Sequence, residues 1–179
     1  MKYIYYLFIF ILLNLISSIA LSQDEMNIDI WSDYSFLMGE WKGINSGQPG
    51  EGISIFSFEL KLDSNILYRT DHNEFNATDK NPAFNHDDIL IIYKEFSDVP
   101  NKAIYFDNEG HLINYTKIEF PERNKSVIFK SDVVKGLPSF KLSYFLNDDG
   151  SLKISFDISQ PDNPDNFISH VEGTAVRVK

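Results

Sequence analysis

Cysteine is absent from this chain of 179 residues, so no disulfide links its segments. The lipid attachment of bacterial lipoproteins, which needs a cysteine, is excluded for the same reason. The sequence also contains no Gly-x-Ser-x-Gly, no His-Glu-x-x-His and no phosphate-binding glycine loop, and its four histidines lack the close spacing of a zinc site. These absences remove the usual signatures of nucleophilic catalysis, metal-dependent catalysis and phosphate binding.

Positive charge is scarce as well. The chain carries 16 lysine and arginine residues against 26 aspartate and glutamate residues, a formal net charge of −10, and the basic residues form no cluster. A nucleic-acid backbone or an anionic membrane surface attracts proteins through such a cluster. We therefore expect neither nucleic acid nor an anionic membrane as a partner.

The first residues have the pattern of a signal peptide. Lys2 precedes an apolar stretch over residues 3–16, and the small side chains of Ala20 and Ser22 follow at the spacing that a signal peptidase requires. We therefore expect residues 1–22 to be removed and the mature protein to be exported, to the periplasm or outside the cell, without a stable membrane anchor. Retention of this segment as an uncleaved anchor is the alternative.

The rest of the chain is a series of short strand signals. Apolar and polar residues alternate along residues 140–146 and 152–158, as in strands with one buried face. Turn sequences, such as those at residues 107–110 and 147–150, separate neighbouring strands. About ten strands of ordinary length result. One strand begins at Trp41, and the other strands span residues 53–62, 65–70, 89–93, 103–106, 111–118, 126–133, 140–146, 152–158 and 168–178.

These features predict an all-β fold, a single antiparallel up-and-down β-barrel of about ten strands that forms one domain over residues 23–179. Residues 31–38 are the one stretch that favours a helix, with Ser32 as N-cap, and we expect this short helix to lie across one end of the barrel. A closed barrel of about this size can hold one small ligand. Two long polar connections, residues 71–88 and 160–166, are expected as loops at the mouth.

Four residues are candidates for ligand contacts because of their positions in these strands and turns. Tyr68 and Arg69 precede the first long connection, so we expect them at the barrel mouth, where a hydroxyl or a guanidinium can bind a carboxylate. Alternation from His111 to Tyr115 puts both on one inner wall. His111 also follows Gly110 directly and can belong to the hairpin turn instead, so both interpretations stay open.

The two ends of the expected barrel resemble a known superfamily. Gly39-x-Trp41, about ten strands, and a last strand that ends in Arg177 are similar to the lipocalin and fatty-acid-binding-protein superfamily, also called calycins. In that superfamily a tryptophan near the first strand stacks against a basic side chain of the last strand and closes one end. The resemblance therefore implies a calycin-like fold and a structural contact between Trp41 and Arg177.

Within that superfamily the sequence is most similar to nitrobindin-like haem-binding barrels and to their exported bacterial relatives, which the block at residues 103–111 resembles. In nitrobindin-like proteins a histidine that opens the last strand binds haem iron, and a second histidine lies over the other face. His170 stands at the position similar to the first, with Thr174 following as in that family, and His86 stands near the second. The resemblance implies haem as a cofactor, with His170 as its iron ligand.

The residues leave several functions open. A lone histidine such as His170 on a partly polar face is often only hydrogen-bonded to its neighbours. We expect an exported barrel that binds a small apolar or planar molecule, with haem as the sharpest candidate and a fatty-acid or aromatic ligand as the alternative. An acid–base enzyme that uses His86, His111, Asp87 and Glu109, such as a lyase or isomerase, and a filled structural barrel are further alternatives. The expected ligand-binding residues are His170, His86, His111, Tyr115, Tyr68 and Arg69.

Overall fold

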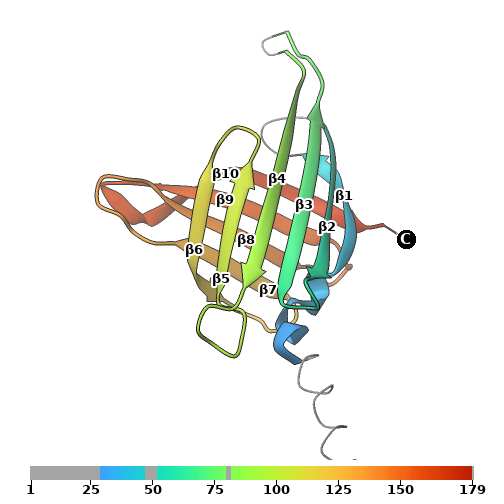
Figure 1. Ribbon diagram of the computed structural model, residues 1–179. Coiled ribbons are helices and arrows are strands. Elements are labelled where there is room, and N and C mark those ends of the chain that lie inside the picture. Colours follow the sequence, from blue (N-terminus) through green and yellow to red (C-terminus); the bar gives the residue numbers. More distant parts are fainter. Residues whose placement is uncertain (1–28, 47–51, 80–81, 179) are drawn as a thin grey trace, which may run out of the picture.

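The computed structural model describes residues 29–46, 52–79 and 82–178. These residues form one 3-10 helix and ten strands (Figure 1). The helix, η1, spans Asp29–Leu37. The strands are β1 (Gly39–Ser46), β2 (Gly52–Lys61), β3 (Ile66–Phe75), β4 (Phe84–Tyr93), β5 (Lys102–Asp107), β6 (Leu112–Glu119), β7 (Ser126–Ser131), β8 (Ser139–Leu146), β9 (Leu152–Gln160) and β10 (Asn163–Arg177).

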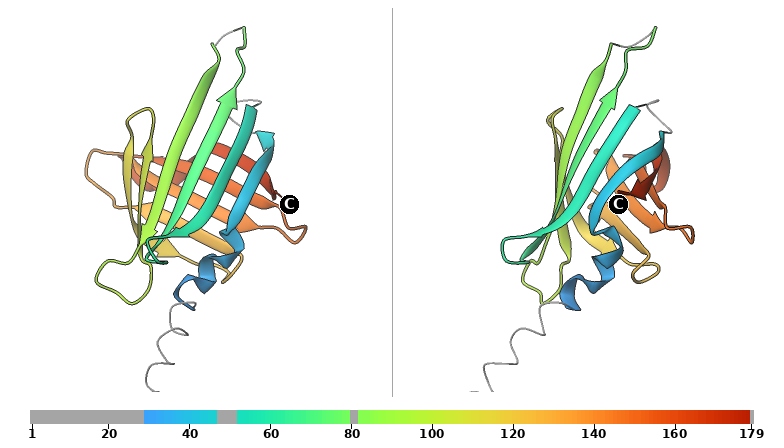
Figure 2. Two further views of the ribbon diagram at one scale, coloured as in Figure 1. Left: turned by 45° about the vertical axis from the view of Figure 1, so that its right-hand side comes forward. Right: turned by 90° about the vertical axis from the view of Figure 1, so that its right-hand side faces the viewer.

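The strands close into a single barrel (Figure 2). Each strand pairs antiparallel with the next one along the chain, and β1 pairs with β10 to complete the ring. Trp41 lies opposite Arg177 in this closing pair. The prediction of an all-β, antiparallel up-and-down barrel of about ten strands with one short helix near its start is confirmed, and the helix is of the 3-10 type.

Alternation along each strand decides which side chains enter the barrel. On β8, Leu142 and Tyr144 are buried in the core, whereas Lys141 before them is on the other face and partly exposed. Leu142 pairs with Phe156 of β9, and Tyr144 pairs with Ile154. Directly paired residues share a face, so these four apolar side chains point inward together, as the sequence pattern predicts.

The helix η1 covers one end of the barrel, which we call the lower end (Figures 1 and 2). The Trp31 indole N–H donates to the Ser64 carbonyl in the β2–β3 turn at 2.8 Å, which ties the helix to the barrel. The Trp41 indole N–H donates to the Leu37 carbonyl, also at 2.8 Å. The guanidinium carbon of Arg177 lies 4.4 Å from the centroid of the Trp41 ring, within the range of a cation–π contact.

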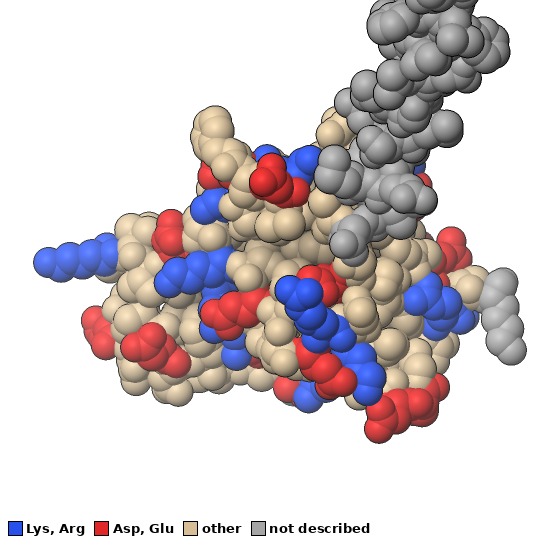
Figure 3. Space-filling model, turned by 90° about the horizontal axis from the view of Figure 1, so that it is seen from below, with Lys and Arg blue, Asp and Glu red and all other residues tan. Residues whose placement is uncertain are grey.

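Arg177 also joins the last strand to the end of the helix. Its guanidinium donates to the carbonyl of Phe36 at 2.9 Å and to the carbonyl of Met38. One side chain thus connects η1, β1 and β10 at the lower end. Seen from below, this end carries acidic and basic side chains interspersed with uncharged ones, without a large patch of a single sign (Figure 3).

The opposite, upper end differs from the sequence expectation. Residues 71–88, expected as a long loop, are mostly strand, because β3 continues to Phe75 and β4 begins at Phe84. The two strands form a long hairpin that extends beyond its neighbours (Figures 1 and 2), and the rings of Phe75 and Phe84 stack with centroids 4.7 Å apart. Residues 160–166 are also mostly strand, since β10 begins at Asn163.

Candidate functional site

The inner faces of β3 and β4 carry charged side chains. Leu67 and Leu90 are fully buried, which fixes the inward-facing parity of the two strands. Arg69 shares the parity of Leu67, and Asp88 shares the parity of Leu90. In the β3–β4 register Arg69 pairs with Leu90, and Asp71 pairs with Asp88. Arg69, Asp71 and Asp88 therefore face the barrel interior.

Arg69 is the centre of this group. The residue is 6% exposed, and its guanidinium forms ion pairs with Asp71 and with Asp88, the second at 3.2 Å from Nη1 to Oδ1. The guanidinium carbon lies 5.5 Å from the ring centroid of Phe56 and 6.0 Å from that of Tyr144. A buried cation is thus held between two carboxylates and two aromatic rings.

Several polar atoms near Arg69 are buried without a hydrogen-bond partner among the residues that the structure describes. These atoms include Nε of Arg69, Oδ1 of Asp71, and the hydroxyl oxygens of Tyr115 and Tyr144. An unpaired buried group costs about 1–3 kcal/mol. We call Arg69, Asp71, Asp88, Tyr115 and Tyr144 the polar cluster. Buried polar atoms without a partner are uncommon in folded proteins, so the polar cluster is a candidate site.

The protonation of the polar cluster follows from its burial. Burial raises the pKa of Asp71, although Arg69 opposes this effect. Burial disfavours the charge of Arg69, but Asp88, Tyr144 and Asp71 raise its pKa above the ordinary value, so the guanidinium stays charged. Burial also raises the pKa of both Tyr115 and Tyr144. Their hydroxyls therefore stay protonated at neutral pH and can donate hydrogen bonds.

A second network, at the upper end, joins β4 to the β5–β6 turn. In His86, Nε2 lies 3.1 Å from the Tyr105 hydroxyl, and Nδ1 lies 3.1 Å from Oε1 of Glu109. The Tyr105 hydroxyl is 3.4 Å from Oδ2 of Asp107. The same oxygen of Asp107 lies 2.8 Å from Nδ1 of His111. We call these five residues the rim network.

The rim network meets the polar cluster at Asp88. Oδ2 of Asp88 lies 3.6 Å from Nε2 of His86. Asp88, followed by Glu109, raises the pKa of His86 to about 9, although burial opposes this rise. His86 is therefore protonated at neutral pH, and both ring nitrogens donate hydrogen bonds instead of binding a metal ion.

His111 is part of the hairpin turn. Its backbone N–H donates to Oδ1 of Asp107 at 2.8 Å, and its side chain is 63% exposed. Tyr115, four residues later, is buried in the core with a relative exposure of 1%. Of the two interpretations of His111, the turn describes its position, and it does not share an inner wall with Tyr115.

His72 and Asp87 pair with each other on the outer face of the β3–β4 hairpin. The ring of His72 contacts the carboxylates of Asp87 and Glu74, and the His72 side chain is 46% exposed. Asp87 follows His86 directly, so its side chain points to the opposite face. Of the four residues considered for acid–base catalysis, the structure brings together His86, His111 and Glu109, and it leaves Asp87 outside.

His170 stands across the barrel from His86. It lies at a bulge of β10, where the register against β9 shifts between Ser169 and Val171. The residue is exposed, and its ring meets the ring of Phe156 edge-on, with centroids 6.3 Å apart. Around the closed barrel, β10 is four strands from β4 in one direction and six in the other. His170 and His86 therefore stand on nearly opposite walls.

Inward-facing side chains become more exposed toward the upper end. On β4, Ile92 and Leu90 are completely buried and Asp88 is 8% exposed, whereas His86 is half-buried and Phe84 is 40% exposed. The lower part of the interior is thus a closed core. The upper part is within reach of solvent.

Two expected ligand residues lie elsewhere than predicted. Arg69 is buried inside the barrel and not at its mouth, because β3 continues beyond it to Phe75. Tyr68 has the opposite parity and faces outward. Sequence reasoning missed Asp71 and Asp88. The available signal was that Arg69 and Asp71 share one strand parity, which places both on the same face if the strand continues through polar residues.

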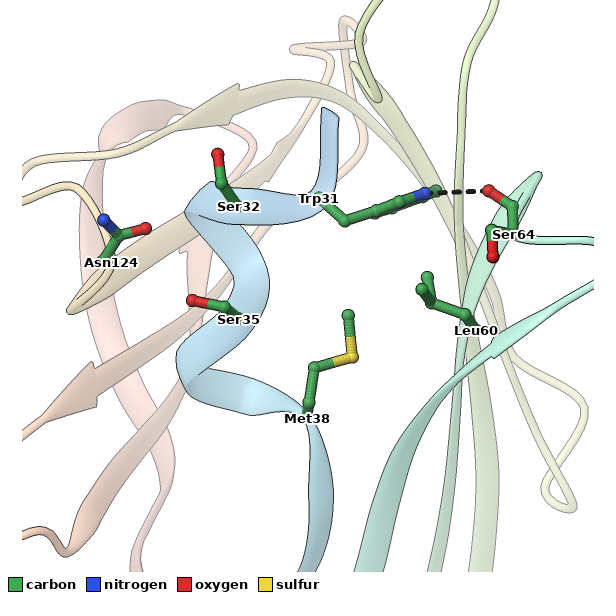
Figure 4. A pocket seen from close by; sticks show the side chains of 7 residues that line it. All are labelled: Trp31, Ser32, Ser35, Met38, Leu60, Ser64 and Asn124. Atoms are coloured by element: carbon green, nitrogen blue, oxygen red, sulfur yellow. Dashed lines mark hydrogen bonds between the residues drawn. The ribbon is translucent and has the colours of Figure 1, made fainter. Parts of the chain in front are cut away.

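A separate open pocket of about 420 Å³ lies at the lower end, between η1 and the β2–β3 turn (Figure 4). Its lining residues carry no formal charge. They are Trp31, Ser32, Ser35, Met38, Leu60, Ser64 and Asn124. In Figure 4 the Met38 side chain extends into the space between the helix and Leu60. None of the residues expected to bind a ligand lines this pocket.

Comparison with models of known protein families finds no match to this chain, and comparison with curated proteins finds none either. Within residues 29–46, 52–79 and 82–178, no three histidine, aspartate or glutamate side chains are grouped in a way that could hold a metal ion. No helix in the described part of the chain is long and apolar enough to cross a membrane. The barrel interior is therefore the basis for assigning a function.

Proposed function

We propose that this protein binds a small planar or apolar molecule in the upper part of its barrel. The observation that carries the proposal is the change in burial along the inner wall, from completely buried at Ile92 and Leu90 to half-buried and exposed at His86 and Phe84. Ligand sites in small barrels lie at a mouth of this kind, above a packed floor.

Aromatic side chains support a planar ligand. Phe140 of β8 and Phe156 of β9 are half-buried on the inner face, and their rings stack with an interplanar angle of 9° and centroids 6.0 Å apart. His170 meets Phe156 from the next strand. A flat molecule can bury its faces against such rings, and each buried square ångström contributes about 25 cal/mol.

Haem is one candidate and a metal-free aromatic or fatty molecule is the other. Iron ligation needs a neutral imidazole, and His86 is protonated at neutral pH because Asp88 and Glu109 raise its pKa to about 9. His170, which no carboxylate holds in the described part of the chain, is therefore the residue proposed to bind iron. His86, whose two ring nitrogens already face Tyr105 and Glu109, would line the entrance for the ligand.

Export is part of the same proposal. The expected signal peptide, residues 1–22, lies outside the described residues, so its cleavage rests on the sequence pattern. N-terminal sequencing of the protein from its own host tests it, and a mature start at or near Gln23 is the expected result. Intact Met1 in a membrane fraction would show that the segment is an anchor.

Titration with hemin separates the two ligand candidates. If haem is the ligand, hemin gives a saturable one-to-one complex with a sharpened Soret band, and His170→Ala abolishes the band without unfolding the protein. His72→Ala is the matched control, because His72 lies at the same end of the barrel on its outer face. It should leave the band unchanged.

Other outcomes of this titration have distinct meanings. Non-stoichiometric hemin binding that His170→Ala does not change would exclude haem. A fluorescent fatty acid or aromatic probe that then binds saturably, with His170→Ala of little effect, would support the metal-free ligand. If hemin and both probes all fail to bind, the interior is filled and the proposed function is wrong.

A further inference from the structure

We infer that the end of the ligand that enters the barrel first is an uncharged group with a hydrogen-bond acceptor, such as the carbonyl oxygen of an aromatic ketone, and that Tyr115 and Tyr144 bind it. This inference rests on the proposed binding function and concerns the floor of the same site. It selects a neutral carbonyl compound over a fatty acid, whose leading end would be a carboxylate.

The two tyrosines lie on one wall of the barrel. Tyr115 belongs to β6 and Tyr144 to β8, and the ring of Phe129, on the intervening strand β7, contacts both, with centroids 5.9 Å and 6.3 Å away. Tyr115 is 1% exposed and Tyr144 is completely buried. Both hydroxyls lack a hydrogen-bond partner within the described residues. They are two neutral donors, already withdrawn from water, that an acceptor group of the ligand can satisfy.

The charges nearby disfavour an anionic ligand. Arg69 is the one cation of the polar cluster, and it is already paired with Asp71 and Asp88. A ligand carboxylate would place a third acidic group beside these two in a site of low dielectric constant. A carbonyl oxygen accepts hydrogen bonds without adding charge. The unpartnered Nε–H of Arg69 is one more donor for it.

The polar cluster also lies at the right depth for this role. Asp88 of the cluster is two residues from His86 on the inner face of β4, and His86 belongs to the solvent-reachable part of the interior. A ligand that passes His86 therefore meets the polar cluster next. Leu67 and Ile92 pair with each other one step further down and are completely buried, and Tyr115 lies in the same row through Ala103, so this row forms the floor of the site.

Two fluorescent naphthalenes test the inference. Prodan is a neutral naphthyl ketone with emission that shifts to the red when its carbonyl accepts hydrogen bonds, and dimethylaminonaphthoate has a carboxylate in place of that ketone. We expect prodan to bind at least about tenfold more tightly than the naphthoate. Tyr144→Phe and Tyr115→Phe should each weaken prodan binding about 5–10-fold, the effect of one lost hydrogen bond, and shift the bound emission to the blue.

Tyr34→Phe is the matched control. Tyr34 is a buried tyrosine at the lower end, its hydroxyl donates to the Pro100 carbonyl at 3.4 Å, and its removal should leave prodan binding unchanged. Equal or tighter binding of the naphthoate, or bound emission that neither floor variant changes, would overturn the inference and leave the binding function standing. Failure of prodan, naphthoate, hemin and the fluorescent fatty acid alike would overturn both.

Discussion

The lower end of the barrel pairs its buried polar groups, whereas the middle of the barrel leaves them unpaired. Trp41 and Tyr34, near the helix, each donate a hydrogen bond to a backbone carbonyl. Tyr115 and Tyr144 have no such partner among the described residues, although they are only 1% and 0% exposed. Buried tyrosine hydroxyls are thus hydrogen-bonded at the lower end of the core and unpaired in its middle.

This difference indicates which part of the barrel stabilises the fold and which part is available for binding. A completely buried, paired aromatic residue such as Trp41 contributes packing and leaves nothing to satisfy. The ion pairs of Arg69 require the desolvation of three charged groups, and a buried ion pair is often no more stabilising than apolar residues of similar volume. We expect the lower end to supply stability and the polar cluster to reduce it in favour of binding.

The largest expected effect comes from removing only the positively charged member of the polar cluster. Arg69→Leu removes the buried cation and leaves Asp71 without a counter-charge and Asp88 with only His86, at 3.6 Å. The free energy of unfolding should fall by about 3–5 kcal/mol. Urea unfolding at neutral pH, followed by tryptophan fluorescence, measures the change.

The complementary variant replaces the cluster completely. Arg69→Leu combined with Asp71→Leu and Asp88→Leu removes the charges together, so most of the lost stability should return, while binding of prodan should weaken. If the triple variant is as unstable as Arg69→Leu alone, the polar cluster stabilises the fold, and the contrast between the two parts of the core does not hold.

A smaller effect is expected at the lower end. Arg177→Ala removes the contact with Trp41 and the hydrogen bonds to Phe36 and Met38, so unfolding should require about 1–2 kcal/mol less. Affinity for hemin or prodan should not change, because the site is at the other end. Arg177→Lys should lose less stability, since it keeps the charge over the ring. Loss of ligand without loss of stability would give Arg177 a role in binding.

The same contrast explains which features the sequence predicts. Hairpins such as residues 140–158 have apolar residues at every second position, because one face packs against the core and the other meets water. The stretch around Trp41 and Arg177 is recognisable because a large aromatic ring and a long cation stand at the two closing strands. Each of these two patterns is typical of only one kind of structure.

The sequence around the polar cluster and the rim network is compatible with either a loop or a strand. The sequence predicts a loop over residues 71–88 because polar residues and a proline fill this stretch, and the period-2 signal vanishes when both faces of a strand are polar. Asp71 and His86 face inward, and His72 faces outward, yet all three look like loop residues. Only pairing across the hairpin, which is a tertiary contact, distinguishes the two cases.

The smallest effect expected is a pH dependence that arises where the rim network meets the polar cluster. Asp88 and Glu109 raise the pKa of His86 to about 9, above the value of about 6.5 for an unfolded histidine. The charged ring therefore stabilises the fold fully below about pH 6.5, and this contribution is lost as the pH rises through about 9. Because the His86 side chain is 25% exposed, solvent screening reduces the contribution to roughly 1 kcal/mol.

His86→Gln, which cannot be protonated, should be less stable than the parent protein by that amount near pH 6 and equal to it near pH 10, as measured by urea unfolding across this range. His72→Gln is the control, since its partners Asp87 and Glu74 are on the exposed outer face. A difference between parent and His86→Gln that stays constant from pH 6 to pH 10 would mean that the charge of His86 does not hold the rim network to the polar cluster.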